Sequence, residues 1–581
     1  MAALRFVPQD VPQADFVIVR TTTPAIDDLL TDLGAYRVTK ENYTLYSWYP
    51  VGADTLFFGA GVVDGRFYVG PTTLAQQPSH FGAGTYTVIG LGDSVATIQP
   101  DIFGMNMLFY SDSLVTNRLH LAALILRSID VNNAISVFYG QTGFSFNFNM
   151  LTTPVKGVQV LPTHSRITVG GNGVVVSTHV QDFSVLEPDE YWELIHAGAE
   201  DVAQNVSAVV NSGYPVLADI SGGRDSRIIF GALVSQGLQH RVIFNTIAQA
   251  TSPMLALDLR IGSGLVARYG GSYEGMPRIV GFSHNSVAQN IERRRSHIFG
   301  SYHWITPADF RPVSGIFKTP VVRMLGGGGE MYRTNWGVIE FSKADPELPA
   351  SAEHIAQALR QPRGRFVSDE MVNRFFPDLL HTFEVLPGQK LGDKIESHYV
   401  NLRSRLHFAA RPILPENSVS ISLATSPYLL RAFRGLPAAE QRSGRVIYDV
   451  LSVFDPQLPL LEFEVPYTKA VFDSRYHRGS TIDQAGAKVE GAEHLVMDRR
   501  ITPYPIPSRR PVESEWDFRT SLESEVSESL AVISRPDSSF AFFVDDHLKE
   551  FVEWAQEHNP NNYAALASKL RFLADLDQIA R

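Results

Sequence analysis

Six consecutive residues, Ser221-Gly222-Gly223-Arg224-Asp225-Ser226, combine two hydroxyl groups, two glycines and a carboxylate directly after a largely apolar run at 215–220. The run predicts a strand, and residues 227–236 predict a helix that Gly237 ends. A tight glycine turn between a strand and a helix directs backbone N–H groups and the positive end of the helix dipole toward one place, which favours a phosphate. The spacing differs from G-x-x-x-x-G-K-[ST], and the lysine of that motif is missing. The segment therefore predicts a phosphate site of another kind.

Asp225 is the residue of this loop whose charge decides the chemistry. A carboxylate next to a phosphate is repelled by it unless a cation lies between them. Asp225 therefore predicts Mg²⁺ together with ATP. The alternative interpretation is an ordinary strand-to-helix turn that binds nothing.

The elements that would position this loop belong to the second of two differently patterned regions. Residues 1–185 read as short strands between glycine and proline turns, with little helix besides 26–33 and 119–128, which is an α+β pattern with much antiparallel sheet. The predicted strands there include 15–20, 55–63, 66–69 and 85–89.

From residue 186 onward, predicted strands and helices alternate. The helices are 189–211, 227–236 and 255–269, and the strands are 215–220 and 242–246. Such alternation predicts a parallel, doubly wound sheet that binds its ligand at the carboxyl ends of the strands. We therefore expect two domains, 1–185 and 186–581.

The last third of the chain has a different composition. Residues 380–461 are predicted to be mostly helical. Residues 474–516 are polar and contain Arg499 and Arg500, followed by prolines at 503, 505, 507 and 511. We interpret this stretch as an irregular surface excursion or a mobile lid; a solvated loop is the alternative.

Composition limits the class of protein. The chain has 581 residues, 44% of them hydrophobic, and a formal net charge of −11, which argues against a nucleic-acid partner bound through phosphates. It contains no cysteine, so disulfides, thiolate metal sites and thioester chemistry are excluded. The N-terminus lacks the pattern of a secretory signal, and no run of 18 apolar residues predicts a membrane span. We expect a cytoplasmic protein.

Several segments besides the loop resemble the asparagine synthetase family in their order, and the resemblance covers most of the chain. The loop itself is similar to the SGGxDS pyrophosphate loop of the N-type ATP pyrophosphatases, which cleave ATP to AMP and pyrophosphate. The other segments are Asp101-Ile102-Phe103-Gly104, Leu108-Phe109-Tyr110-Ser111, Thr152-Thr153-Pro154 with Gly157-Val158, Leu161-Pro162-Thr163-His164, Val321 to Met324 running into Gly326-Gly327-Gly328-Gly329-Glu330, Arg411-Pro412-Ile413-Leu414-Pro415, Leu436-Pro437 and Gly444-Arg445.

The chain departs from this family at its second residue. Glutamine-using members have a cysteine nucleophile there, whereas this chain has Ala2 and no cysteine elsewhere. Glutamine hydrolysis is therefore excluded. The arrangement resembles the β-lactam synthetases and lasso-peptide cyclases, which use an amine already on the substrate. The resemblance implies a degenerate Ntn-amidohydrolase-like αββα sandwich, followed by an ATP-pyrophosphatase (HUP-like) synthetase domain.

The resemblance also implies residues that bind the nucleotide and the metal. Asp225 and Glu330 would be the Mg²⁺ ligands, although Glu330 is alternatively a carboxylate at a helix N-terminus. The residues expected at the nucleotide are Ile220, Ser221, Gly222, Gly223, Asp225, Ser226, Asn245, Gly326 and Gly327. Arg227 has two interpretations, a phosphate contact or a surface arginine.

The amide-forming step needs a positive charge and a base. Arg445 stands where the family has a lysine that stabilises negative oxygen; Lys469 is the alternative source of that charge. Glu396 and Tyr332 are the candidate general bases, chosen by position.

The expected activity is adenylation of a carboxylate followed by attack of an amine, without glutamine. Ring closure in natural-product biosynthesis is the leading expectation, with a macrolactam ahead of a β-lactam. Amidation with ammonia or a small amine, and a catalytically inactive ATP-binding scaffold, are the alternatives. The expected partners are a carboxylate and an amine substrate, with a peptide among the candidates, and a second copy of the chain in a homodimer.

Overall fold

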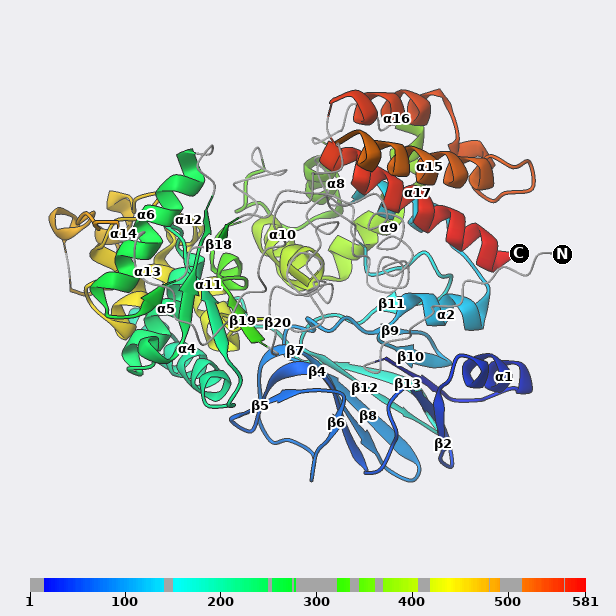
Figure 1. Cartoon of the computed structure of the whole chain (residues 1–581), viewed down its shortest axis with the longest axis horizontal. Helices are drawn as coiled ribbons and strands as arrows, with labels where there is room; N and C mark the ends of the chain where they lie inside the picture. Colours follow the sequence, from blue (N-terminus) through cyan, green and yellow to red (C-terminus); the bar gives the residue numbers. More distant parts are fainter. Residues whose placement is uncertain are drawn as a thin grey trace.

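Two antiparallel sheets form the N-terminal part of the protein, as the strand pattern predicts (Figure 1). The computed structural model describes residues 15–140, 150–248, 253–273, 276–277, 321–334, 344–360, 369–405, 418–479, 481–491, 515–558 and 560–581. The first sheet has the order β11-β9-β10-β1-β3-β2, and the second has the order β13-β12-β8-β7-β4-β5 with β6 beside β4.

The strands of these sheets are short apart from two. Those of the first sheet are β1 (Phe16–Val19), β2 (Tyr36–Thr39), β3 (Thr44–Ser47), β9 (Phe109–Tyr110), β10 (Leu114–Thr116) and β11 (Gln159–Val160). Those of the second are β4 (Thr55–Val63), β5 (Arg66–Val69), β6 (Thr72–Thr73), β7 (Phe81–Leu91), β8 (Val95–Pro100), β12 (Ser165–Gly170) and β13 (Gly173–Thr178).

The alternation of side chains along the strands makes these sheets a sandwich. In β1, Phe16 and Ile18 pack into one core with residues of β4, β7 and β12 from the second sheet. Val17 and Val19 point to the opposite side, where they pack with the helices α1 (Pro24–Asp32), α2 (Leu119–Leu126) and α3 (Val131–Gly140). A strand with a period of two residues can bury both faces only in such a layered arrangement.

The C-terminal helices return to cover this helical layer. They are α8 (Ala352–Arg360), α9 (Asp369–Val385), α15 (Glu515–Ile533), α16 (Asp546–His558) and α17 (Pro560–Ala580). Helix α17 packs on α2 and α3, and one hydrophobic core contains both Val17 and Leu570 (Figure 1). The predicted division of the chain at residue 185 stays a prediction, because this core joins residues from both of its sides.

A parallel sheet follows, with the order β17-β15-β14-β19-β20. Its strands are β14 (Val216–Asp219), β15 (Ile243–Asn245), β17 (Ser272–Tyr273), β19 (Val321–Leu325) and β20 (Ser418–Ser422). The helices packed with it are α4 (Pro188–Val210), α5 (Asp225–Ser235), α6 (Pro253–Arg268), α11 (Pro427–Arg434) and α13 (Arg445–Phe454). The predicted alternation of strand and helix, and the parallel sheet, are confirmed.

The remaining elements are short. They are β16 (Ile247–Ala248) paired in parallel with β18 (Met276–Pro277), the helices α10 (Leu391–His398), α12 (Ala438–Ser443) and α14 (Lys469–Phe472), the 3-10 turns η1 (Gln239–Arg241), η3 (Gly329–Tyr332), η6 (Leu458–Leu460), η7 (Ile482–Gln484) and η8 (Ala541–Phe543), and the π-helical turn η4 (Tyr399–Arg403).

Two predictions made from the sequence concern the C-terminal part of the chain. The described part of 380–461 is mostly helical, as predicted, but it also contains β20, an edge strand of the parallel sheet. Its sequence Ser-Val-Ser-Ile-Ser is short and half polar, so its strand signal is weak. The segment 411–415, Arg499, Arg500 and the prolines after them lie outside the described residues.

The sandwich and the parallel-sheet region are joined through η4. The guanidinium of Arg405 is buried and donates to the carbonyls of Gly104 at 2.6 Å and Leu161 at 2.8 Å. The side-chain carbonyl of Asn401 accepts from the backbone N–H of Thr163 at 2.9 Å and from its hydroxyl at 3.0 Å. These buried contacts hold η4 in place, together with the end of α10 that precedes it.

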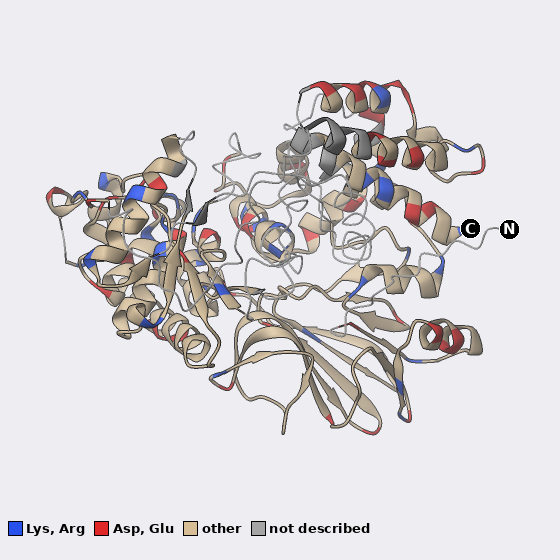
Figure 2. Ribbon diagram, in the orientation of Figure 1, with Lys and Arg blue, Asp and Glu red and all other residues tan. Residues whose placement is uncertain are grey.

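Charged residues of both signs lie mainly on the helices, while the strands of the sandwich are mostly uncharged (Figure 2). Within the described parts of the chain, no helix combines the length and the apolar character that crossing a membrane requires.

His164 gives the fold a pH-dependent stability. Burial, with Arg434 and His179 nearby, lowers the pKa of His164 to about 3. An unfolded histidine titrates at about 6.5, so the unfolded chain binds more protons between pH 6.5 and pH 3. Stability is therefore complete above pH 6.5 and falls with acidification. The backbone φ of His164 is 56°, a conformation that asparagine tolerates.

We predict that His164→Asn removes this part of the pH dependence. Between pH 7 and pH 5, the unfolding free energy of the wild type should fall by about 2 kcal/mol more than that of the variant. Urea denaturation at several pH values measures both slopes. Parallel slopes would contradict the prediction, whatever constant difference the lost imidazole causes.

Candidate functional site

The candidate site lies where the strand order of the parallel sheet reverses. β14 has β15 and β17, the next strands in the chain, on one side, and β19 and β20 on the other. Loops that leave the two strands flanking such a point diverge and open a crevice at the carboxyl ends of the strands. The loop after β14 carries the segment 221–226, and the loop after β19 carries 326–330. The topology thus brings the two glycine-containing segments to the same edge of the sheet.

Two serine side chains shape the first loop. The backbone N–H of Ser221 donates to the hydroxyl of Ser226 at 3.2 Å, and the N–H of Gly223 donates to the hydroxyl of Ser221 at 3.1 Å. Helix α5 begins at Asp225, and Arg224 before it makes no side-chain cap hydrogen bond. The N–H groups of the first helical turn have no partner within the helix, so the positive end of α5 can receive an anion. The predicted strand, turn and helix are confirmed; the phosphate stays a prediction.

The segment 458–467 packs against this loop and supports it. The N–H of Glu464 donates to the carbonyl of Gly222 at 2.8 Å, and Arg224 donates to two carbonyls of the segment at 3.2 Å each. Arg227 is fully buried and donates to three carbonyls of the same segment, the shortest bond being 2.7 Å. The predicted surface position of Arg227 is therefore wrong, and its predicted phosphate contact stays a prediction. Its guanidinium satisfies carbonyls that would otherwise be buried without partners.

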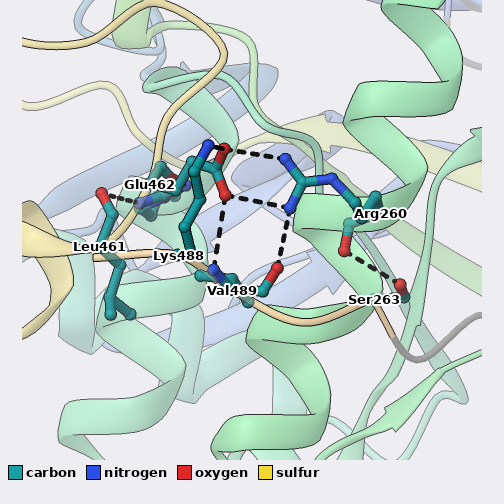
Figure 3. A network of polar contacts seen from close by, with 7 residues as sticks. Arg260, Ser263, Leu461, Glu462, Lys488 and Val489 are labelled. Carbon is teal, nitrogen blue, oxygen red and sulfur yellow. Dashed lines mark hydrogen bonds and ion pairs between the residues drawn. The ribbon is translucent and has the colours of Figure 1, made fainter. Parts of the chain in front are cut away.

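Glu462 fixes this supporting segment to α6 (Figure 3). Its two carboxylate oxygens accept from Arg260 at 2.8 and 3.0 Å, and one of them accepts from Lys488 at 2.6 Å. The hydrogen bonds from Arg260, followed by that from Lys488 and the backbone N–H of Val489, lower the pKa of Glu462 to about 2. Because the carboxylate stays ionised, the support of the loop does not change across neutral pH.

Several polar residues beside the loop were missed by sequence reasoning. Asp258 on α6 accepts the backbone N–H of Gly222 at 2.8 Å. Asn245, predicted to lie near the nucleotide, donates to Asp219 at 2.6 Å, and Asp219 also pairs with Arg323 at 2.9 Å. These contacts join residues far apart in sequence, so no local pattern could have indicated them. A nucleotide contact of Asn245 stays a prediction.

The glycine run after β19 packs directly on the first loop. A Cβ atom at Gly326 would lie 2.7 Å from the Cα of Ser226, and one at Gly329 would lie 2.8 Å from the Cβ of Asp225. Gly328 has a φ of 98°, which a side chain would strain. The run therefore lets two backbones approach each other at the carboxyl edge of the sheet.

We predict that Gly329→Ala separates the two loops. Because the added methyl group would contact Asp225 far inside the normal van der Waals distance, the backbone must shift, at a cost of about 1–3 kcal/mol. Thermal denaturation should show the loss, and affinity for a magnesium–ATP analogue should fall with it. Gly52→Ala is the matched control, because a Cβ there meets nothing within 4 Å. Equal behaviour of the two variants would contradict the packing argument.

Two carboxylates lie at this junction, Glu330 buried and Asp225 with 24% of its side chain exposed. Glu330 is 6% exposed; its Oε2 accepts the N–H of Gly328 at 2.8 Å, while its Oε1 has no hydrogen-bond partner among the described residues. Oδ1 of Asp225 is likewise buried without such a partner there. Burial, followed by the charge of Asp225, raises the pKa of Glu330 to about 8. Burial also raises the pKa of Asp225, against the opposing effect of Arg333 and Arg224.

This donor set fits Mg²⁺. The ion is usually held by one or two carboxylates together with water and substrate phosphates, and both carboxylates here retain an open oxygen. Among the described residues, no group of three or more histidine, aspartate or glutamate side chains forms a metal cluster. The arrangement therefore suits a metal that arrives with a phosphate ligand better than one held by protein alone.

Arg333, another residue that sequence reasoning missed, stands at the end of η3. Its Nη2 atom lies 2.6 Å from Oδ2 of Asp225, and its side chain is 47% exposed. In this structure the cationic partner of Asp225 is therefore a guanidinium.

Arg445 lies in a buried cluster of charged and polar side chains. It is fully buried at the start of α13, where it pairs with Asp449 at 3.2 Å and Glu440 at 3.7 Å and contacts Nδ1 of His477 at 3.2 Å. Burial raises the pKa of Asp449 to about 7. Gly444 before it lies against Arg224 of the first loop, so Arg445 stands next to the site. Its predicted contact with a reacting oxygen stays a prediction.

The candidate bases lie in different surroundings. Tyr332 is buried; its hydroxyl donates to the carbonyl of Ala424 at 2.7 Å and accepts the N–H of Ser426 at 2.8 Å, and burial raises its pKa far above the ordinary value. The hydroxyl of Tyr332 thus joins two segments of the fold, and its role as general base stays a prediction. Glu396 is buried on α10, and its role as base stays a prediction. Lys469, the alternative to Arg445, is exposed and lies 3.6 Å from Asp473.

No protein-family model matches the sequence, and no curated protein matches it either.

Proposed function

We propose that the protein is an ATP-dependent amide-bond synthetase that forms AMP and pyrophosphate and does not use glutamine. The observation that carries the proposal is the meeting of two loops at the reversal point of a parallel sheet. There an uncapped helix N-terminus lies beside the carboxylates of Asp225 and Glu330, each with one buried oxygen that has no partner among the described residues. Backbone N–H groups suit phosphate oxygens, and the carboxylates suit Mg²⁺.

The fold supports the same proposal. An antiparallel sandwich with helices outside its first sheet, followed by a parallel sheet of reversing order, agrees in these features with the αββα sandwich and synthetase domain that the resemblance to the asparagine synthetase family implies. We therefore propose a degenerate Ntn-amidohydrolase-like domain followed by an ATP-pyrophosphatase (HUP-like) synthetase domain. The sandwich would serve as a structural part, since its contacts through Arg405 and Asn401 hold η4 in place.

The proposed reaction has two steps. A carboxylate oxygen of the substrate attacks the α-phosphorus of ATP, and pyrophosphate leaves; an amine then attacks the acyl carbon, AMP leaves, and the amine loses a proton. Bound Mg²⁺ would neutralise charge on the phosphate chain. The chain's own contribution is to hold the departing phosphates at the N-terminus of α5, through Ser221, Gly223 and Ser226, and to hold the metal by Asp225 and Glu330.

The substrate is proposed at the level of chemical class. The amine and the carboxylate belong to one molecule in the leading proposal, a ring closure such as macrolactam or β-lactam formation, and a peptide is one candidate substrate. Amidation with ammonia or a small amine is the second proposal. A homodimer and a cytoplasmic location stay predictions.

A non-catalytic ATP-binding protein is the second candidate function. The burial of Arg445 among Asp449, Glu440 and His477 favours it, because this charge is already compensated. The two candidates differ in one respect: the scaffold binds ATP without cleaving it.

The test is Mg²⁺-dependent pyrophosphate release from ATP in the presence of a panel of acids. The panel contains aspartate with ammonia, β-amino acids, and short peptides with a free N-terminus and an acidic side chain. The proposal predicts AMP and pyrophosphate in equal amounts with one class, and none with Asp225→Ala. ADP and phosphate as products, or equal turnover by wild type and variant, would contradict it.

A further inference from the structure

Asp225 is the point at which a protein cation and a metal would compete. Arg333 pairs with Oδ2 of Asp225, whereas Oδ1 of the same carboxylate is buried without a partner among the described residues. Arg333 also lies close enough to Glu330 to lower the pKa of that carboxylate. The guanidinium therefore pairs with one of the carboxylates that the proposed function assigns to Mg²⁺ and acts electrostatically on the other.

The contact is one that an incoming ion can displace. Arg333 follows η3, its N–H donates to the carbonyl of Glu330 at 3.2 Å, and almost half of its side chain is exposed. Exposed ion pairs of this kind contribute little to stability. A dication between the two carboxylates would repel the guanidinium, which would then swing outward while its backbone stays fixed.

The displaced side chain would remain beside the N-terminus of α5. Its partner in the present structure, Asp225, is the first residue of that helix. A guanidinium has a planar fork of N–H groups that matches two oxygens of a phosphate. A phosphate held at the helix N-terminus is thus the nearest anion of matching geometry.

We propose that Arg333 neutralises the charge of Asp225 in the nucleotide-free protein and moves to the phosphates of the nucleotide when the magnesium–nucleotide complex binds. This proposal rests on the proposed function. It makes Arg333 a nucleotide-binding residue, and it makes the free protein a poor site for the metal alone. Metal and nucleotide would then bind together more tightly than their separate affinities imply.

The test measures two affinities whose expected changes have opposite signs. The full-length protein is titrated with Mn²⁺ alone, followed by electron paramagnetic resonance, and with α,β-methylene-ATP in saturating Mg²⁺, followed by calorimetry. Arg333→Gln should bind Mn²⁺ alone about threefold more tightly than the wild type, because the competing charge is gone. It should bind the nucleotide about tenfold more weakly, because a charge-assisted phosphate contact is lost.

Two further variants make the test specific. Arg333→Lys keeps the charge but not the fork, so Mn²⁺ affinity should stay near that of the wild type while nucleotide affinity falls in part. Arg37→Gln is the matched control, because Arg37 pairs with Asp27 at 2.7 Å with a closely similar exposure, in the sandwich. It should leave both affinities unchanged.

The outcomes separate this proposal from the proposed function. If the wild type binds both ligands and Arg333→Gln behaves like Arg37→Gln, the proposed exchange of Arg333 between Asp225 and the phosphates is wrong, while the proposed nucleotide site is retained. Tighter Mn²⁺ binding with unchanged nucleotide affinity also overturns the exchange. A wild type that binds neither ligand overturns the proposed function, and the exchange with it.

Discussion

Replacing Asp225 with asparagine is expected to abolish Mg²⁺-dependent pyrophosphate release without destabilising the protein. The amide keeps the size of the side chain and the start of α5, but it cannot supply the anionic oxygen that a metal needs. We expect a loss of about a thousandfold or more. The folded state should be unchanged or more stable by about 1 kcal/mol, because the substitution removes a negative charge that burial disfavours. Pyrophosphate release and thermal denaturation measure the two effects.

Opposite effects on activity and stability distinguish a metal ligand from a structural residue. Glu330→Gln should behave in the same way, since Oε1 of Glu330 is also buried without a partner among the described residues. Asp27→Asn is the matched control: Asp27 pairs with Arg37 and accepts the hydroxyl of Tyr46 at 3.0 Å, away from both loops. It should leave the rate unchanged. If the activity of Asp225→Asn falls only as far as the amount of folded protein falls, the assignment of Asp225 as a metal ligand is wrong.

Arg405→Ala is expected to have the largest effect on stability. The guanidinium is 1% exposed and bonds to the carbonyls of Gly104, Leu161 and Asn401. Its removal leaves buried carbonyls without partners and a cavity between the sandwich and η4. We expect a loss of about 3–5 kcal/mol in the free energy of unfolding. Urea denaturation measures it.

The control for Arg405 is an exposed arginine. Arg374 pairs with Glu370 at 3.0 Å on the surface of α9, and Arg374→Ala should change stability by about 0.5 kcal/mol or less. Similar stabilities of the two variants would show that the junction contributes little.

The sequence was sufficient to predict the elements that carry the first loop. The strand at 216–219, the turn and the helix from Asp225 follow from local rules: an apolar run, two glycines and a helix closed by Gly237, whose φ is 65°. The pairing of two carboxylates was predicted only through a resemblance. Its geometry depends on Gly326 and Gly329 packing against the first loop, which is a long-range contact.

The partners of charged side chains could not be predicted. Arg227 was expected to contact phosphate or solvent, yet it is buried because the carbonyls of 458–467 need donors there. Arg333 and Asp258 meet the loop from positions about 110 and 35 residues away in the chain, a separation at which no periodicity operates. The segments at 101–104 and 161–164 were noted only for their resemblance, and the structure shows them as contacts of Arg405.

The central claim is that residues 221–226 and 326–330 form one magnesium–nucleotide site. Calorimetric titration with α,β-methylene-ATP, with and without Mg²⁺, tests it without knowledge of the acid or the amine. We predict that one nucleotide binds per chain, about tenfold or more tightly with Mg²⁺ than without it, and that the double variant Asp225→Asn, Glu330→Gln loses this enhancement. Absence of saturable binding, or the same enhancement in the double variant, would contradict it.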